Sequence, residues 1–113
     1  MFAQLMGLRT ISPRDLERRM QAEPIIVIDV NARASWLGAR VPGAKSLDPT
    51  GFTASDLPAE PDALLVFYCS GPLCRKAPNA ARRAKGMGHT NVAVMSAGIS
   101  GWLGGRLPTE SGE

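Results

Sequence analysis

The sequence has only two cysteines and one histidine among its 113 residues. Two cysteines and a lone histidine at this spacing fit no zinc-binding pattern, so we expect no metal site. No apolar run approaches the length of a membrane span. The opening residues, MFAQLMGLRT, also lack the basic segment followed by an apolar segment that marks a signal peptide. We therefore expect a cytoplasmic protein with no membrane partner, whose cysteines are reactive thiols rather than structural bridges.

The sequence also lacks a large excess of charge of either sign. The net charge is +3, from 13 Lys+Arg against 10 Asp+Glu. This is too weak to indicate nucleic-acid binding, but it favours small anions. The sequence has neither a phosphate-binding loop nor a dinucleotide fingerprint, and we expect no organic cofactor. A hydrophobic content of 44% and a charged content of 20% are typical of a folded globular protein. We expect one domain over residues 1–113, with its core at about 10–108 and no indication of its oligomeric state.

Short apolar segments alternate with helical segments along the chain. We predict strands at residues 9–11, 25–29, 46–47, 64–68 and 91–95. We predict helical segments at residues 12–22, within 31–39, around 55–57, at 77–85 and at 99–103. This alternation predicts an α/β fold, with an open, mostly parallel sheet of about five strands and helices on both faces. We expect residues 1–8 to be a loose lead-in and residues 104–113 to be a polar tail that is frayed at its end.

The most informative stretch runs from Leu64 to Lys85. It reads as a buried strand, a short loop with Gly71 and an alanine-rich basic helix. Cys69 stands at the carboxyl end of this strand, where parallel α/β sheets place their ligands. It also faces the amino end of a helix, so we predict a lowered pKa for its thiol. The alternative is a buried structural cysteine.

The loop after Cys69 is predicted to surround its sulfur with backbone N–H groups. The candidate donors are Ser70, Gly71, Leu73, Cys74 and Arg75. Pro72 has no N–H to donate. Arg75 and Lys76 either clamp an anionic substrate or begin a solvated helix. Cys74 is either a resolving thiol for Cys69 or a small residue that points into the protein.

Asp29 ends another buried strand at the same edge of the predicted sheet. We expect its carboxylate to fix the loop around Asn31 by hydrogen bonds, a role that we favour over general-base catalysis. Trp36 and Trp102 are expected in the core or at its rim rather than as platforms for substrate.

Three segments together resemble the rhodanese family. They are residues 28–30 with Val41-Pro42-Gly43-Ala44, then Tyr68-Cys69 with Gly71, and finally Gly98-Ile99-Ser100-Gly101-Trp102. Each motif alone is weak, but all three in this order are specific, and the resemblance covers residues 10–108. It implies an open parallel sheet of about five strands. It also implies that Cys69 carries sulfane sulfur as a persulfide.

The chain departs from this family at informative positions. Asn31 stands where the family usually has arginine, and Arg40 where it usually has histidine; we assign Arg40, with Asp29, a supporting role. The loop reads cysteine, five residues, arginine, which resembles the cell-cycle phosphatases and arsenate reductases built on the same fold. Those enzymes have a histidine at the position of Tyr68. Some sulfurtransferase-like single domains carry a similar cysteine-x-glycine-proline-x-cysteine loop.

The resemblance implies a sulfurtransferase that moves sulfur from thiosulfate or another persulfide donor to a thiol, protein thiols included, or to cyanide. Its partners would be a small anionic sulfur donor and a thiol acceptor, with no nucleic acid. One alternative is a cysteine phosphatase or an arsenate reductase, in which Cys74 would close a disulfide. The phosphatase lacks support because no Asp or Glu occurs between Asp62 and Glu110 to supply an acid beside the loop. The other alternative is a non-enzymatic sulfur carrier or binding module.

Overall fold

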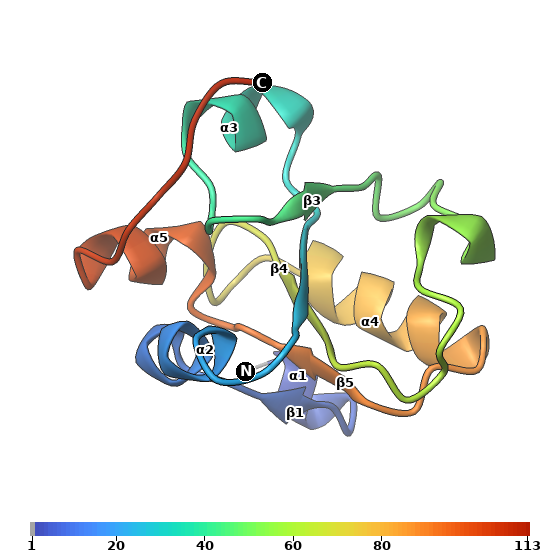
Figure 1. Ribbon diagram of the computed structural model, residues 1–113. Helices are drawn as coiled ribbons and strands as arrows, with labels where there is room; N and C mark the ends of the chain where they lie inside the picture. The colour runs from blue at the N-terminus through green and yellow to red at the C-terminus, as the bar shows by residue number, and fades with distance from the viewer. Residues whose placement is uncertain (1) are drawn as a thin grey trace.

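The protein is built around one five-stranded sheet, seen in a computed structural model that describes residues 2–113 (Figure 1). The strands are β1 (Arg9–Thr10), β2 (Ile26–Asp29), β3 (Lys45–Ser46), β4 (Leu65–Tyr68) and β5 (Val92–Val94). Their order in the sheet is β1-β5-β4-β2-β3, and all the pairings between them are parallel. This arrangement confirms the predicted α/β class and places the strand before Cys69 at the centre of the sheet.

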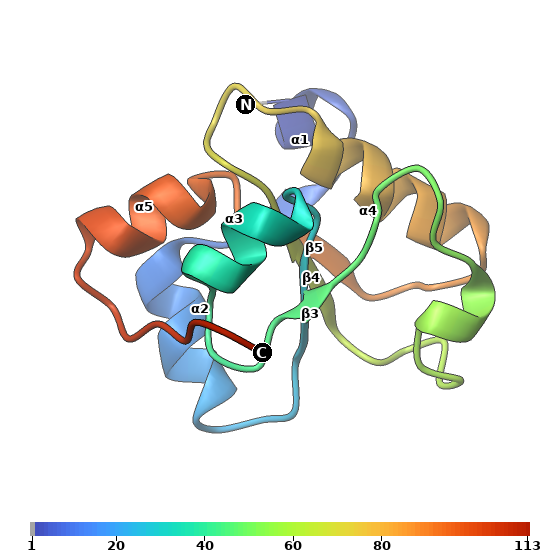
Figure 2. The same cartoon turned by 90° about the horizontal axis from the view of Figure 1, so that it is seen from above.

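Helices cover both faces of the sheet, as predicted. They are α1 (Phe2–Leu5), α2 (Pro13–Met20), α3 (Arg33–Gly38), α4 (Lys76–Gly86), α5 (Gly98–Gly104) and a 3-10 turn, η1 (Ala54–Asp56). The core residues of α1 and α4 pack in one apolar cluster, and those of α2 and α5 pack in another. The view from above shows α1 beside α4 and α2 beside α5 (Figure 2). Within residues 2–113, no helix is long and apolar enough to cross a membrane.

The alternation of side chains along β4 decides which face the candidate thiol occupies. Leu65 and Phe67 pack in the cluster under α1 and α4, whereas Val66 and Tyr68 pack in the cluster under α2 and α5. Successive residues of a strand point to opposite faces, and all four residues of β4 are buried. Cys69 continues this alternation, so it belongs to the side of the sheet that α1 and α4 cover.

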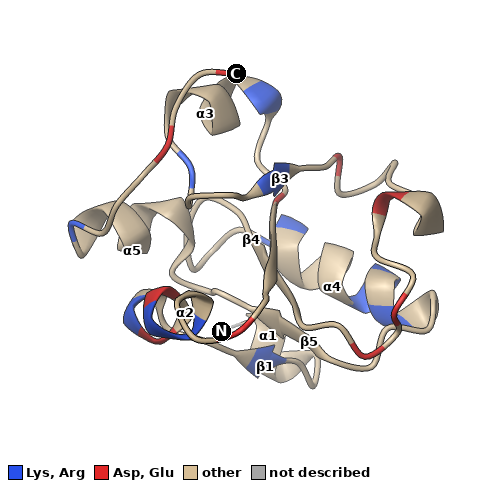
Figure 3. Ribbon diagram, viewed as in Figure 1, with Lys and Arg blue, Asp and Glu red and all other residues tan. Residues whose placement is uncertain are grey.

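Helix α4 approaches the sheet through small side chains. Its buried residues are Ala77, Pro78, Ala80, Ala81 and Ala84. Its basic residues Arg82 and Lys85 are exposed, and Figure 3 shows this basic character along α4. The helix begins at Lys76, one residue before the predicted start. Pro78 is tolerated there because the first N–H groups of a helix have no partner within it.

The amino-terminal segment is not a loose lead-in, and that prediction is wrong for residues 2–8. Helix α1 packs against the core, with Ala3 only 1% exposed and Leu8 only 4% exposed. Four residues are too few to show a helical period in the sequence, and so short a helix depends on tertiary packing. Met1, which the same prediction included, lies outside the described residues.

The carboxyl-terminal tail is also held in place, so the expectation of a frayed end is wrong. Glu110 forms a two-way backbone bridge with Arg40. The backbone N–H of Gly112 donates to the carbonyl of Leu37 at 2.8 Å. The tail is polar and irregular, and its partners are backbone groups distant in sequence, so no local pattern could predict these contacts.

Candidate active site

Cys69 lies directly after β4, where the chain turns into the loop that leads to α4. Only 3% of its surface is exposed. Its Sγ atom lies 3.6 Å from the backbone carbonyl oxygen of Cys74, to which the thiol donates a hydrogen bond. The cysteine is therefore enclosed by its own loop at the carboxyl edge of the sheet, as the sequence predicted.

Helix α5 fixes the backbone of this loop. The N–H of Ile99 donates to the carbonyl of Cys69 at 2.9 Å, and the N–H of Ser100 donates to the carbonyl of Ser70 at 3.1 Å. Gly98 has a φ of +64°, and a Cβ atom at this position would lie 2.5 Å from the carbonyl carbon of Ser70. Glycine is therefore required here both by conformation and by space. The sequence analysis singled out Gly98 only as part of a family motif.

The loop donors differ in part from those predicted. The backbone N–H groups of Ala77 and Ser70 act on the Cys69 sulfur, and Ala77 was not among the predicted donors. The N–H of Cys74 is instead used in a turn, where it donates to the carbonyl of Gly71 at 3.1 Å. The side chain of Leu73 is 77% exposed and points away from the protein.

The pKa values of the two thiols shift in opposite directions. The pKa of Cys69 is raised from its ordinary value of 9.0 to about 12, chiefly by burial and also by the Cys74 thiol, against the lowering effect of the Ala77 and Ser70 N–H groups. The prediction of a lowered pKa is therefore wrong. Burial acts to raise the pKa of Cys74 too, but hydrogen bonds from Cys69, Lys76 and Ser70 outweigh it and lower that pKa. Of the two thiols, Cys74 therefore loses its proton more readily than Cys69.

A small cavity lies against the Cys69 thiol. Its volume is about 10 Å³, close to the smallest that can hold one water-sized sphere. The walls come from α1, the loop, the start of α4 and the chain after β5, and most of them are apolar. The cavity is lined by Phe2, Ala3, Cys69, Gly71, Pro72, Cys74, Ala77, Pro78, Val94, Met95 and Ser96. There is room for a single additional atom beside the sulfur.

Ser96 brings a polar group to this cavity that the sequence analysis missed. Its Oγ atom is buried and has no hydrogen-bond partner, although the residue lines the cavity. A buried hydroxyl without a partner is unfavourable by about 1–3 kcal/mol, so its presence points to an acceptor that occupies the cavity. Its place after a strand at the same sheet edge as Cys69 was the one signal available in the sequence.

Arg75 and Lys76 lie at the mouth of the loop and are exposed. The guanidinium of Arg75 lies over the ring of Phe2, 4.4 Å from its centroid, which links the loop to α1. Lys76 lines a wider groove together with Arg33 and Asp48. Both cations can draw an anion toward the loop, but the guanidinium is directed to an aromatic face.

Asp29 and Tyr68 connect the ends of two neighbouring strands behind Cys69. Asp29 is fully buried, and it accepts a hydrogen bond from the backbone N–H of Asn31 at 2.8 Å. This contact confirms the predicted role of Asp29 in fixing the Asn31 loop. The Tyr68 hydroxyl donates to the other carboxylate oxygen and accepts from the N–H of Val41 at 3.1 Å. Burial raises the pKa of Asp29, and the hydrogen bond from Tyr68 acts to lower it.

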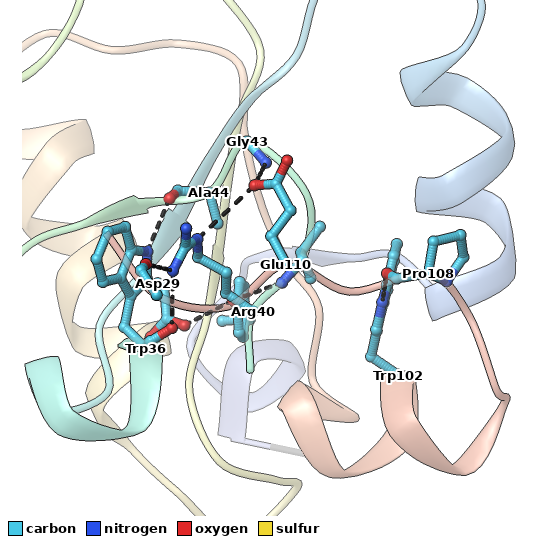
Figure 4. Close-up of polar contacts among 11 residues, drawn as sticks. Asp29, Trp36, Arg40, Gly43, Ala44, Trp102, Pro108 and Glu110 are labelled. Atoms are coloured by element: carbon cyan, nitrogen blue, oxygen red, sulfur yellow. Dashed lines mark hydrogen bonds and ion pairs between the residues drawn. The ribbon is translucent and has the colours of Figure 1, made fainter. Parts of the chain in front are cut away.

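The side chain of Arg40 is surrounded by partners from α3 and the carboxyl-terminal tail (Figure 4). Its guanidinium stacks on the ring of Trp36 at 3.8 Å and donates to the carbonyl oxygens of Trp36 and Gly112 at 3.1 and 2.7 Å. Its Nε atom lies 3.7 Å from a carboxylate oxygen of Glu110. Arg40 therefore links α3 to the carboxyl-terminal tail.

The two tryptophans lie where the sequence predicted, at the rim and in the core. The indole N–H of Trp36 donates to the carbonyl of Ala44 at 2.8 Å, and Trp36 is half-buried. Trp102 is 1% exposed, and its indole N–H donates to the carbonyl of Pro108 at 2.7 Å.

A family model described as a rhodanese-like domain matches residues 12–104 of this chain. The chain is 26% identical over 100 residues to an uncharacterized protein of Synechocystis, covering 88% of this chain and 55% of that protein. It is 28% identical over 102 residues to an HTH-type transcriptional regulator of Mycobacterium tuberculosis, covering 90% of this chain and 45% of the regulator. The chain therefore spans about half the length of these curated relatives.

Solved structures share the fold. A protein from Bacillus halodurans superimposes with a TM-score of 0.83 at 22% identity, covering 96% of this chain and 80% of that one. A thiosulfate sulfurtransferase from Pseudomonas aeruginosa gives 0.79 at 26% identity, covering 94% of this chain and 20% of the larger one. A protein from Rhodopseudomonas palustris named as a possible tyrosine phosphatase gives 0.75 at 24% identity, covering 96% and 88%.

Proposed function

Because this chain belongs to the rhodanese-like domain family, we propose that it is a sulfurtransferase that carries sulfane sulfur on Cys69. The donor is thiosulfate or another persulfide, and the acceptor is a thiol or cyanide. The observation that carries this proposal is the cavity beside Cys69, which has a volume of about 10 Å³ and mostly apolar walls. A persulfide adds one weakly hydrated atom to the cysteine, and that atom matches the space available.

The first step is attack by the Cys69 sulfur on the outer sulfur of thiosulfate. A new S–S bond forms on Cys69, the S–S bond of thiosulfate breaks, and its electron pair leaves with sulfite. Since burial raises the pKa of Cys69, the Cys69 thiol must lose its proton before its sulfur attacks. The N–H groups of Ser70 and Ala77, which act on the Cys69 sulfur, then stabilise the persulfide.

Arg75 and Lys76 are proposed to attract the anionic donor to the loop. Both are exposed beside it, and α4 carries further positive charge (Figure 3). We propose a cytoplasmic setting for the reaction, where thiol acceptors are available.

A cysteine phosphatase or arsenate reductase is the second candidate. The five-residue interval between Cys69 and Arg75 favours it, as does the shared fold of the structure named as a possible tyrosine phosphatase. Two observations weigh against the phosphatase: the guanidinium of Arg75 lies over the ring of Phe2, and no Asp or Glu occurs between Asp62 and Glu110 to supply an acid beside the loop. A non-enzymatic carrier or sensor of sulfur is the third candidate, since one relative is a transcriptional regulator.

The test runs two assays on one preparation, with Cys69→Ser as the blank. We expect Cys69-dependent formation of thiocyanate from thiosulfate and cyanide, and negligible hydrolysis of aryl phosphates. Brief thiosulfate treatment of Cys74→Ser should add about 32 Da, removable by a thiol reductant. Phosphate release without thiocyanate would favour the phosphatase, and a sulfur adduct without turnover would favour the carrier.

A further inference from the structure

A second thiol shares the cavity with Cys69. Cys74 is half-buried and forms part of the cavity wall. The turn closed by its N–H on the carbonyl of Gly71 folds the loop back, so that the Cys74 carbonyl lies 3.6 Å from the Cys69 sulfur. The two residues are therefore adjacent in space although five positions separate them in the sequence.

The two thiols also interact with each other. The neighbouring Cys69 thiol lowers the pKa of Cys74, and the Cys74 thiol adds to the effect of burial in raising the pKa of Cys69. Backbone N–H groups of Lys76 and Ser70 add to the stabilisation of a negative charge on Cys74. Cys74 thus lines the same cavity as Cys69, and its lowered pKa favours the thiolate that acts as a nucleophile.

We propose that Cys74 is a resolving thiol that releases the sulfur bound to Cys69 as sulfide. The Cys74 thiolate attacks Sγ of the Cys69 persulfide and forms a Cys69–Cys74 disulfide. The persulfide S–S bond breaks, and its electron pair and the persulfide proton leave with the outer sulfur as HS⁻. The sulfane sulfur is reduced to sulfide while the two cysteines are oxidised. This inference rests on the proposed function, because the persulfide must form first.

The cavity favours this reaction over direct attack by a bulky thiol. Cys74 already lines the cavity of about 10 Å³ beside the Cys69 sulfur, whereas a bulky external thiol must first enter it. The buried Oγ of Ser96 borders the same space and can donate a hydrogen bond to the departing sulfur. A soluble dithiol reductant would then return the disulfide to two thiols, which makes each turnover consume one equivalent of reductant.

The experiment follows one round of reaction. Reduced protein is freed from reductant, treated with thiosulfate and desalted; intact mass and released sulfide are then measured. We expect the natural chain to release about one sulfide per molecule and to end about 2 Da lighter, with a peptide that joins Cys69 and Cys74. Cys74→Ser and Cys74→Ala should instead retain the adduct of about 32 Da and release at least tenfold less sulfide.

A matched control keeps two thiols in the chain but separates them. The double variant Cys74→Ser/Asn79→Cys moves the second thiol to an exposed position on α4. It should behave like Cys74→Ser. Sulfide release by this control at the natural rate would overturn the inference, since any nearby thiol would then suffice.

The outcomes separate this inference from the proposed function. A stable adduct of about 32 Da on the natural chain, without sulfide, would overturn the resolving role and leave the sulfurtransferase proposal intact. Absence of both adduct and sulfide in the natural chain and in Cys74→Ser would overturn both. A chain that carries sulfur on both cysteines, or on Cys74 instead of Cys69, would show that the sulfur passes to Cys74 and is not released as sulfide. Either result would overturn the inference.

Discussion

The hydroxyl of Tyr68 lies 2.6 Å from a carboxylate oxygen of Asp29, and this buried contact ties the residue before Cys69 to the end of the adjacent strand. Tyr68 and Asp29 are also direct partners in the register of β4 and β2. The hydroxyl accepts from Val41 as well, so one side chain joins three segments at the edge of the sheet that carries Cys69.

We expect Tyr68→Phe to reduce the free energy of unfolding by about 1.5–3 kcal/mol near neutral pH, because a buried carboxylate loses a donor. Without this donor the already raised pKa of Asp29 should rise further. A group with a raised pKa stabilises the fold when protonated and loses that contribution as pH increases, so the loss should be smaller in acid. Urea unfolding at several pH values, in a double-mutant cycle with Asp29→Asn, measures this coupling. Equal losses at all pH values would contradict the argument.

The second prediction concerns the pH dependence of Cys69. Both the hydrogen bond and the charge of Cys74 raise the pKa of Cys69, so Cys74→Ala should lower it, though burial should keep it above 9.0. In the natural chain, alkylation of Cys69 should rise with pH without a plateau up to pH of about 9. In Cys74→Ala the rate at neutral pH should increase, by about tenfold for each unit of lowered pKa. Peptide mapping separates the two sites in the natural chain, and superimposable Cys69 profiles would refute the coupling.

Ser96→Ala should weaken sulfur loading without weakening the fold. If the Ser96 hydroxyl donates a hydrogen bond to the persulfide, its removal should shift the loading equilibrium with thiosulfate and sulfite by about two- to tenfold toward the free thiol. Thermal stability should be unchanged or higher, because the variant removes a buried hydroxyl without a partner. The measurement uses the Cys74→Ser background. Ser100→Ala, at an exposed position close to the loop, is the control, and an equal shift in both would argue against Ser96.

Arg75→Ala tests the attraction of the anionic donor. If the guanidinium turns from the ring of Phe2 to hydrogen-bond the donor directly, the lost contact is worth about 1.5–3 kcal/mol, and kcat/KM for thiosulfate should fall by about 10- to 150-fold. Arg82→Ala removes the same charge from an exposed position on α4 and should have a much smaller effect. If both variants lose activity equally, the net charge of the helix matters rather than the position of Arg75.

Gly98→Ala tests the support that α5 gives to the loop. Its added Cβ would meet the backbone of Ser70 and Gly71 at 2.5 and 2.6 Å, and its φ of +64° disfavours alanine. We expect a loss of about 1–3 kcal/mol in the free energy of unfolding, together with slower sulfur transfer. At Gly104, near the end of the same helix, an added Cβ has nothing within 4 Å, so Gly104→Ala should be neutral or nearly so. Equal effects would indicate a general sensitivity of α5.

The sequence predicted the sheet and the position of Cys69 because both depend on local patterns. The apolar run of β4, the Ser12 cap and the alanine spacing of α4 are each visible within a few residues. Ser12 stands directly before Pro13, which is a local signal for a helix start, and its side chain accepts from the N–H of Asp15 at 3.1 Å. The resemblance to the family motifs also indicated the order of these elements along the chain.

What the sequence could not predict depends on contacts between distant segments. The raised pKa of Cys69 arises from burial under α1 and α4, whereas the expected lowering considered only the helix dipole and nearby N–H groups. The cavity walls combine Phe2, Cys74 and Ser96, which no spacing rule connects. Likewise, the carbonyl of Gly112 reaches Arg40 across 72 positions of the chain.

The pairing of β1 with β5 has a consequence for how the protein is made. Arg9 is the register partner of Ala93, so β1 can pair with β5 only after about 84 further residues have been synthesised. This takes roughly 4–17 s at ordinary elongation rates. Val94, Met95 and Ser96, which close one side of the Cys69 cavity, are translated in the same late interval. Ser96 follows Cys69 by 27 residues, so the nascent thiol precedes the last wall of its cavity by roughly 1–5 s and is enclosed only as the last strand is added.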